Sequence, residues 1–266
     1  MRTPFDAFED VMLTVKPLPA LQDNYIWVMQ QDSIGAVVVV DPGEAQPVID
    51  YLDKQGSGLE AILITHHHHD HTGGVEALKA RYGARVIGPD NPRIAAIDET
   101  VREGDSFRLL GRQFEVMETP GHTLDHVSYL SSGTPSLLFC ADTLFCGGCG
   151  RLFEGTPEQM FTALSRFAAL DDDTLVFGAH EYTLANLKFA RAAEPDNALR
   201  DELFAECQRA RDMNRPTLPS NIGREKAINP FMRAHLEGVQ QAAAAHGESG
   251  DAATTFATLR AWKDRF

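Results

Sequence analysis

Five of the ten histidines in this 266-residue chain fall within the six positions from His66 to His71. The cluster directly follows the apolar run Ala61-Ile62-Leu63-Ile64, which has the pattern of a buried strand, and it precedes the pair Gly73-Gly74. Clustered imidazoles are hard to satisfy in an apolar core unless they bind a metal ion. The feature therefore predicts a strand that ends in a loop of metal ligands, where α/β sheets commonly bind their ligands.

The pattern of apolar residues changes near residue 180. Before it, strand-like runs alternate with helical segments; after it, the pattern is almost entirely helical. The predicted strands are 25–29, 36–40, 61–65, 85–88, 114–119, 127–130 and 136–140, and the predicted helices are 74–82, 157–170, 184–193, 197–211, 230–244 and 252–263. We therefore predict an α/β domain over residues 1–180 and a smaller helical domain over residues 181–266. Residues 1–12 fit neither pattern and are expected to form a loosely held extension.

Composition excludes several classes of partner. The 24 Lys and Arg against 38 Asp and Glu give a net charge of −14, whereas binding a nucleic acid requires a basic surface. No run approaches the ~18 apolar residues of a membrane span, and Asp6, Glu9 and Asp10 interrupt the region where a secretory signal would be apolar. The single CxxC, Cys146 to Cys149, lacks the second ligand pair of a structural zinc site. We therefore expect a cytoplasmic protein without nucleic-acid or membrane partners.

The histidine cluster offers ligands for two metal ions. Successive side chains of an extended segment project to opposite sides, so His66 and His68 are predicted to share one side. Asp70 and His71 follow where the chain turns into a helix, and they can serve a second ion. Imidazole nitrogens combined with a carboxylate oxygen suit zinc, and also iron or manganese.

Three isolated residues downstream complete two ligand sets. His122, Asp142 and His180 each follow a predicted strand. Taken alone, a polar residue in such a place is usually a turn or capping residue, but with the cluster these three supply the missing ligands. Asp41 also follows a strand, and it is either a hydrogen-bond partner of a ligand histidine or an ordinary turn residue.

The HxHxDH pattern at 66–71, the later GHT at 121–123, the isolated aspartate and the last histidine resemble the metallo-β-lactamase superfamily. Further segments are similar to the glyoxalase II, or hydroxyacylglutathione hydrolase, family in its bacterial form: residues 24–27, 119–123, 142–145, 149–155, 178–183, 229–233 and 259–266. The similarity extends from about residue 18 to the last residue. The metal motif identifies only the superfamily, whereas the C-terminal segments are specific to the family.

The resemblance implies an αββα sandwich followed by a smaller, mainly helical domain. It also implies a binuclear metal site, with one ion bound by His66, His68 and His122, a second by Asp70, His71 and His180, and Asp142 bridging the two ions. Asp70 and Asp142 are the residues expected to act in catalysis.

The resemblance places the glutathione contacts on Arg151, Phe153, Tyr182, Arg260 and Lys263. Eukaryotic members have Lys and Tyr in place of Arg151 and Phe153. Arg151 keeps the charge and can bind a carboxylate with two hydrogen bonds, but Phe153 cannot donate one. Arg260 and Lys263 are three apart on a predicted helix and therefore face the same side.

The implied reaction is hydrolysis of an S-(2-hydroxyacyl)glutathione, such as S-D-lactoylglutathione, to glutathione and a 2-hydroxy acid by a hydroxide that bridges two divalent ions. Zinc is the expected metal, with iron or manganese as alternatives, and a monomer is expected. Two other classes stay open: another hydrolase or a persulfide dioxygenase of the same fold, and a metal-binding protein without catalysis. Thiol release from the thioester distinguishes them.

Overall fold

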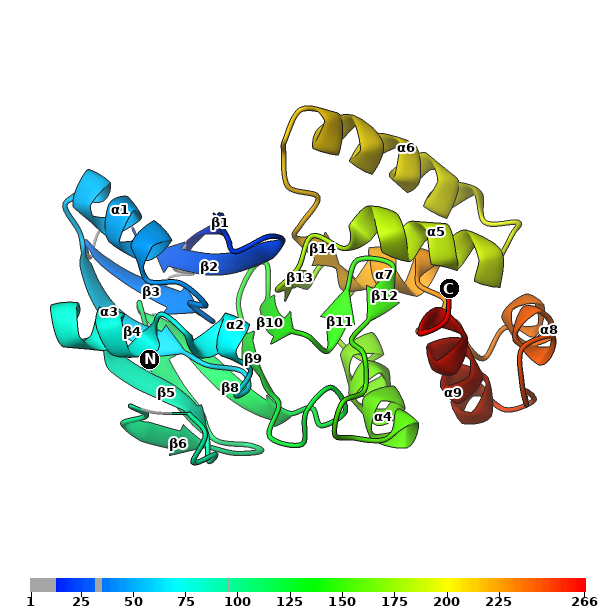
Figure 1. The fold of residues 1–266 in the computed structure, drawn as a ribbon, viewed down its shortest axis with the longest axis horizontal. Helices are drawn as coiled ribbons and strands as arrows, with labels where there is room; N and C mark the ends of the chain where they lie inside the picture. The colour runs from blue at the N-terminus through cyan, green and yellow to red at the C-terminus, as the bar shows by residue number, and fades with distance from the viewer. Residues whose placement is uncertain (1–12, 32–34, 95) are drawn as a thin grey trace, which may run out of the picture.

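The computed structural model describes residues 13–31, 35–94 and 96–266; the expected extension, residues 1–12, lies outside them. Two six-stranded sheets form the centre of the molecule (Figure 1). The first has the order β1 (Thr14–Ala20), β2 (Asn24–Gln30), β3 (Ala36–Val40), β4 (Gly58–Leu63), β5 (Arg85–Pro89), β6 (Glu99–Val101). The second has the order β14 (Ser220–Asn221), β13 (Leu175–Gly178), β10 (Leu137–Ala141), β9 (Val127–Ser131), β8 (Arg112–Glu118), β7 (Ser106–Leu109).

A short hairpin and nine helices complete the described part of the chain. The hairpin consists of β11 (Leu144–Phe145) and β12 (Gly148–Cys149). The helices are α1 (Gln46–Gln55), α2 (His69–Thr72), α3 (Val75–Tyr82), α4 (Pro157–Ala168), α5 (Thr183–Ala193), α6 (Ala198–Asp212), α7 (Ile222–Ile228), α8 (Glu237–Ala244) and α9 (Ala252–Lys263). Over these ranges, we find no helix with the length and apolar character needed to cross a membrane.

Alternating side chains of the first sheet explain the layered architecture. On β3, Val38 and Val40 face a core shared with the second sheet, whereas Val37 and Val39 pack in a separate cluster with Val48 of α1. A strand buried on both faces reads as a continuous apolar run, as β3 does. Helices therefore cover the outer face of the first sheet.

The outer face of the second sheet carries the rest of the helices. Leu138 of β10 and Val176 of β13 share a cluster with Phe167 of α4 and Phe256 of α9. The helical region after residue 180 thus packs on this sheet, and β14 from that region pairs with β13 at the sheet edge. The predicted αββα sandwich with a helical C-terminal region is confirmed.

One predicted helix is shorter than expected. The pattern predicts a helix over 230–244, but α8 begins only at Glu237. Residues 230–236 form turns instead, in which the amides of Met232 and Arg233 donate to the carbonyls three residues back (3.0 and 3.2 Å). The Asn229 side chain anchors the first of these turns, because it accepts a hydrogen bond from the amide of Phe231 (3.1 Å) and donates to the carbonyl of Gly148 (3.0 Å).

The two sheets are joined along one edge. The indole of Trp27 in β2 donates to the carbonyl of Gly178 in β13 (2.9 Å), and the amide of Tyr25 donates to the carbonyl of Ala179 (2.7 Å). On the other side, the amide of Val127 at the start of β9 donates to the carbonyl of Thr65 (2.9 Å). The loops that follow β4, β8, β10 and β13 therefore meet at this edge.

Candidate metal centre

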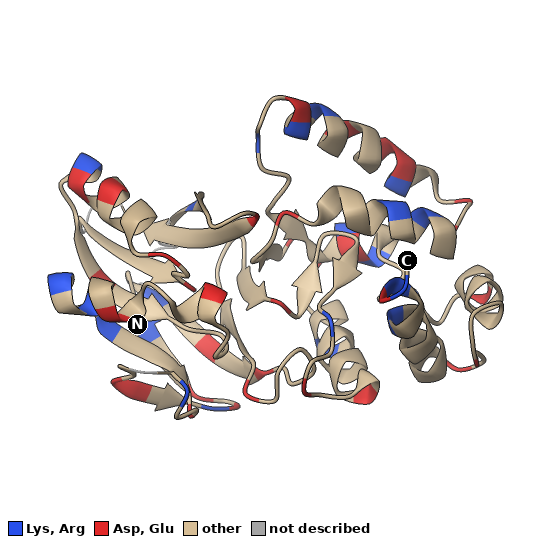
Figure 2. Ribbon diagram, in the orientation of Figure 1, with Lys and Arg blue, Asp and Glu red and all other residues tan. Residues whose placement is uncertain are grey.

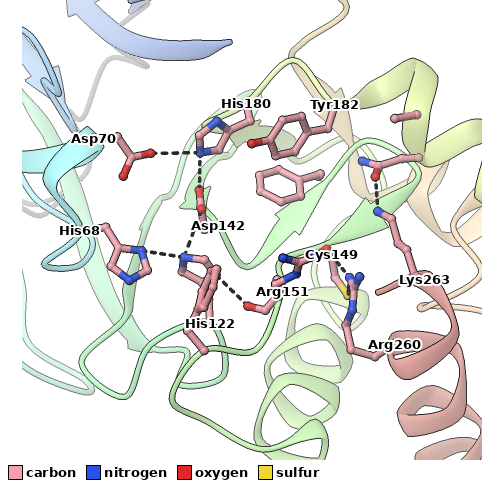
Figure 3. Close-up of a pocket in the computed structure, with 14 residues that line it drawn as sticks. His68, Asp70, His122, Asp142, Cys149, Arg151, His180, Tyr182, Arg260 and Lys263 are labelled. Atoms are coloured by element: carbon pink, nitrogen blue, oxygen red, sulfur yellow. Dashed lines mark hydrogen bonds and ion pairs between the residues drawn. The ribbon is translucent and has the colours of Figure 1, made fainter. Parts of the chain in front are cut away.

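The first predicted ligand set lies at this edge. His66 and His68 follow β4, and His122 comes from the loop between β8 and β9. One ring nitrogen from each can be chosen so that all lie within 4.8 Å of one another. Nε2 of His122 is 3.0 Å from Nδ1 of His68 (Figure 3). The structure therefore brings together three imidazoles from two loops, close enough to share one ion.

The second set lies beside the first. Asp70 and His71 belong to α2, and His180 follows β13; their ligand atoms are also within 4.8 Å of one another. Oδ2 of Asp70 is 3.3 Å from Nε2 of His71 and 3.6 Å from Nε2 of His180. A short helix after the histidine loop thus supplies two of the three groups.

Asp142 lies between the two sets. Its Oδ2 is 3.2 Å from Nε2 of His122, and its Oδ1 is 3.3 Å from Nε2 of His180 (Figure 3). A side chain at Gly150 would place its Cβ 1.9 Å from the carbonyl oxygen of Asp142. Glycine at this position allows the chain to pass close behind the aspartate.

Buried atoms without hydrogen bonds indicate that the arrangement fits metal ions. Nε2 of His66, Nε2 of His71 and Oδ1 of Asp142 are buried and make no hydrogen bond within the described residues. A buried polar atom without a hydrogen bond costs about 1–3 kcal/mol, and bound cations would satisfy all three. Imidazole and carboxylate donors suit divalent zinc, iron or manganese.

Protonation differs between the two sets. Burial lowers the pKa of His66, His68 and His122 below the usual histidine value. Burial also opposes the charge on His71 and His180, but the neighbouring carboxylates together outweigh it and raise the pKa of both: Asp142, Asp41 and Asp70 act on His71, and Asp142 and Asp23 on His180. The first set is therefore ready to bind a cation, whereas the second must release protons to do so.

Asp41 holds one of these histidines. Its Oδ2 is 3.1 Å from Nδ1 of His71, and it also accepts hydrogen bonds from Thr65. Of the two roles considered for Asp41, the structure shows the hydrogen-bond partner, here of the candidate ligand His71. A partner on Nδ1 leaves Nε2 of the ring facing the candidate metal position.

Two further partners escaped the sequence reasoning. Oδ1 of Asp23 is 2.8 Å from Nδ1 of His180, and Nδ2 of Asn24 donates to Oδ2 of Asp70 (3.0 Å). Both residues lie where β1 turns into β2, and the bridge between Asn24 and His180 brings this turn to the site. No local motif reveals their role, because it depends on a contact between distant segments.

A cavity of about 550 Å³ extends from the candidate metal centre to α9. This volume lies within the usual range for small-molecule sites. Basic residues gather where the end of α9 meets the loop after β12 (Figure 2). The predicted substrate contacts line the cavity together with metal-centre residues and four others: Phe145, Cys149, Ala185 and Asn186.

The basic residues differ in how freely they can reach a ligand. Arg260 is 5% exposed, and it donates to the carbonyls of Cys149 (2.8 Å) and Gly150 (3.3 Å). Asp264 accepts hydrogen bonds from both Arg260 and Arg151. Most donors of Arg260 are therefore used within the chain, while the more exposed Arg151 borders the open cavity.

Lys263 has a partner that the sequence did not suggest. Its ammonium donates to Oδ1 of Asn186, whose amide donates in turn to the carbonyl of Cys146 (3.1 Å). Burial, reinforced by the charge of Arg260, lowers the pKa of Lys263 to about 8. Asn186 thus holds a lysine whose charge is only weakly favoured in this position.

The two predicted aromatic contacts lie against the histidines. Tyr182 stacks on His180 with ring centroids 4.7 Å apart and planes 3° apart. Phe153, which is 61% exposed, presents its ring at 5.2 Å and near right angles to His122. Both rings therefore border the opening between the candidate metal centre and the cavity.

An αββα sandwich with two adjoining His and Asp sets at one edge defines a protein of the metallo-β-lactamase fold. The family model for the metallo-beta-lactamase superfamily matches residues 22–180, and the model for the hydroxyacylglutathione hydrolase C-terminus matches residues 181–266. The chain belongs to the hydroxyacylglutathione hydrolase family of this superfamily.

Similar proteins cover nearly the whole chain. Hydroxyacylglutathione hydrolase of Chromohalobacter salexigens is 64% identical over 96% of this chain and 100% of its own length. The protein of that name from Pseudomonas fluorescens is 48% identical over the same shares. The family assignment therefore rests on both parts of the chain.

Solved structures share the fold at lower identity. ETHE1 from Myxococcus xanthus has a TM-score of 0.64 at 24% identity, covering 95% of this chain and 98% of that one. The B3 metallo-beta-lactamase BLEG-1 has a TM-score of 0.63 at 23% identity, covering 83% of this chain and 99% of that one. At these identities the likeness establishes the fold alone.

Proposed function

We propose that this protein is an enzyme that hydrolyses the thioester of an S-(2-hydroxyacyl)glutathione, with S-D-lactoylglutathione as the reference substrate. The products are glutathione and a 2-hydroxy acid, D-lactate in that case, and the role is removal of methylglyoxal. The observation that carries the proposal is the continuous cavity that joins the two His and Asp sets to the basic end of α9. The name of the 64% identical relative describes the same activity.

The candidate metal centre fits the first half of the reaction. We propose that His66, His68 and His122 hold one divalent ion, Asp70, His71 and His180 a second, and that Asp142 bridges them, with zinc as the proposed metal. Divalent ions at this position would polarise the thioester carbonyl and lower the pKa of a bound water to about 7. Asp70 and Asp142 both lie within 3.6 Å of Nε2 of His180, where their carboxylates can accept hydrogen bonds from a water molecule and orient it.

The far end of the cavity fits the rest of the substrate. Glutathione carries two carboxylates, which Arg151 and Lys263 can pair with, and Arg260 fixes the loop beside them. Burial raises the pKa of Tyr182, so its hydroxyl stays protonated and can donate a hydrogen bond. The leaving thiolate has a conjugate-acid pKa of about 8.5 and needs no strong general acid.

The two parts of the chain are proposed to have different roles. Residues 1–180 would carry the catalytic groups, and residues 181–266 would supply most of the substrate contacts. We propose a monomer that acts in the cytoplasm. Its four buried free thiols are consistent with a reducing compartment.

The test measures thiol release from S-D-lactoylglutathione colorimetrically. Turnover of a β-lactam, a lactone, a phosphodiester and glutathione persulfide is measured in parallel. We expect rapid release from the thioester and slow or no turnover of the others. Tight metal uptake without thiol release would identify a binding protein instead. Preferred turnover of another substrate would reassign the reaction within the same fold.

A further inference from the structure

A polar cluster at the rim of the candidate metal centre has no part in the reaction proposed above. Its central contact joins Nδ1 of His67 to Oδ1 of Asp125 at 2.9 Å. Oδ2 of Asp125 accepts a hydrogen bond from Asn91 (2.7 Å), and Nη1 of Arg93 is 2.8 Å from Nε2 of His67. Four loops thus meet in this cluster, because Arg93 also donates to Glu154 (3.0 Å).

The protonation of His67 follows from its neighbours. A guanidinium group can only donate, so Nε2 of His67 must accept from Arg93 and the ring proton lies on Nδ1. That proton is donated to Asp125. Both ring nitrogens are therefore satisfied in the neutral form.

The same contacts argue against a third metal site. His67, Asp125 and Glu154 place possible ligand atoms within 4.8 Å of one another. Arg93, however, places its positive guanidinium beside both His67 and Glu154, where it would repel a metal cation. The cluster is a complete hydrogen-bond network.

The position of the contact along the chain gives it a further meaning. His67 lies between the candidate ligands His66 and His68, and Asp125 lies three residues after His122. The hydrogen bond thus ties together the two loops that supply the first ligand set. The side chains of His67 and Asp125 are only 8% and 10% exposed, so water cannot readily replace the contact.

We propose that the His67–Asp125 hydrogen bond is a positioning contact that sets the place of His122 relative to His66 and His68, and with it the affinity of the first set for a divalent ion. The inference rests on the proposed metal centre. It assigns neither residue to catalysis, since neither lines the cavity.

The test measures zinc binding without substrate, by competition between a chelator and the metal-free protein. Asp125→Ala is expected to weaken the binding of one of the two ions about tenfold and to leave the binding of the other nearly unchanged. This is the size of effect that hydrogen-bond partners of ligand residues have on metal affinity. Asp125→Asn is expected to retain most of the affinity, because the amide oxygen can still accept from Nδ1 of His67. Asp53→Ala, which removes an exposed carboxylate on α1, is the matched control and should change neither ion.

Two further variants assign the effect to the contact and to the first set. His67→Ala should weaken zinc binding as much as Asp125→Ala does. The double variant should bind zinc no more weakly than either single variant, because both substitutions remove the same hydrogen bond. His67→Ala also serves if Asp125→Ala does not fold. The weakening should persist in a His180→Ala background, which dismantles the second set, and vanish in a His122→Ala background.

Three results would overturn the inference: unchanged zinc affinity in Asp125→Ala, equal losses in Asp125→Asn and Asp125→Ala, or additive losses in the double variant. Failure of the proposed function looks different. It would be seen in the unaltered protein, as zinc binding without thioester hydrolysis or as no zinc binding at all.

Discussion

Asp41 and His71 form a buried pair, with Oδ2 of the aspartate 3.1 Å from Nδ1 of the histidine. The carboxylate also accepts hydrogen bonds from the amide and the hydroxyl of Thr65, at 2.8 and 2.7 Å. The backbone of Asp41 has a φ of 52°, a left-handed conformation that is uncommon outside glycine. One residue in an uncommon conformation therefore holds both the start of the histidine loop and a candidate ligand.

Asp41→Ala is expected to lower both stability and metal affinity. Removing one member of a buried charged pair costs about 3 kcal/mol or more, which denaturant unfolding of the metal-free protein would measure. Loss of the partner on Nδ1 of His71 should weaken zinc binding about 10- to 100-fold. A variant with normal zinc affinity would remove Asp41 from the support of the site.

Asp142→Ala tests the bridging role. Because Asp142 contacts both ligand sets, its loss should reduce bound metal toward one ion per chain and lower kcat by more than about 100-fold. Metal analysis and thiol release on the same sample check both effects. Two retained ions with full activity would refute the role.

Lys263→Ala tests the basic end of the cavity. The lysine is proposed to hold a remote carboxylate of the substrate, so KM should rise about tenfold while kcat changes little. Arg265→Ala removes the same charge from an exposed residue near the end of α9 and should alter neither constant. Arg260 is a poorer probe, because it also holds the carbonyls of Cys149 and Gly150.

The lowered pKa of Lys263 predicts a pH dependence of kcat/KM. Burial lowers its pKa from 10.5 to about 8, so above pH 8 the free enzyme loses the charge that attracts the substrate. kcat/KM should therefore fall above about pH 8, since it reports ionisations of the free enzyme. Lys263→Arg keeps the charge and should abolish this fall; an identical profile would assign the ionisation elsewhere.

The contribution of Lys263 to the free energy of unfolding should rise with pH, whereas kcat/KM should fall. Between pH 8 and 10.5 the unfolded chain still binds the proton that folded Lys263 has lost. The free energy of unfolding contributed by this group therefore rises with pH through that window. Comparing Lys263→Met with the unaltered protein in denaturant at several pH values isolates the contribution, and a contribution that falls with pH would contradict the lowered pKa.

Gly150→Ala tests the close approach behind Asp142. An added Cβ would lie 1.9 Å from the aspartate's carbonyl oxygen, so the chain must shift, at a cost of about 1–3 kcal/mol. We expect reduced stability and weaker metal binding. Gly238→Ala in α8 is the matched control, because its Cβ would meet no atom within 4 Å. Equal behaviour of the two variants would mean that the approach at Gly150 is not restrictive.

The candidate ligand residues could be predicted from residue type and position along the chain taken together. A single polar residue after a strand is usually a turn or capping residue, but the histidine cluster left two ligand sets incomplete, so His122 and His180 could be predicted as further candidate ligands despite their distance along the chain. The α/β character of the first domain was predictable because buried strands such as β3 read as apolar runs, whereas the αββα arrangement was expected from the resemblance to the metallo-β-lactamase superfamily.

The supporting residues could not be predicted in the same way. Asp23 reaches His180, 157 positions further along the chain, only because the start of β2 is bridged to the segment after β13. Asn186 meets Lys263 only when α5 and α9 pack on the same hairpin. The first turn before α8 is likewise anchored by a distant contact, because the Asn229 side chain bonds to the carbonyl of Gly148. These features depend on tertiary contacts, which cannot be predicted from helical or strand periodicity.

The central claim is most directly tested by titrating the metal-free protein with zinc while measuring bound metal and S-D-lactoylglutathione hydrolysis on the same samples. We expect no hydrolysis without metal and a maximal rate when two ions are bound per chain. Full activity in the metal-free protein, or a rate that is maximal at one ion, would contradict the account.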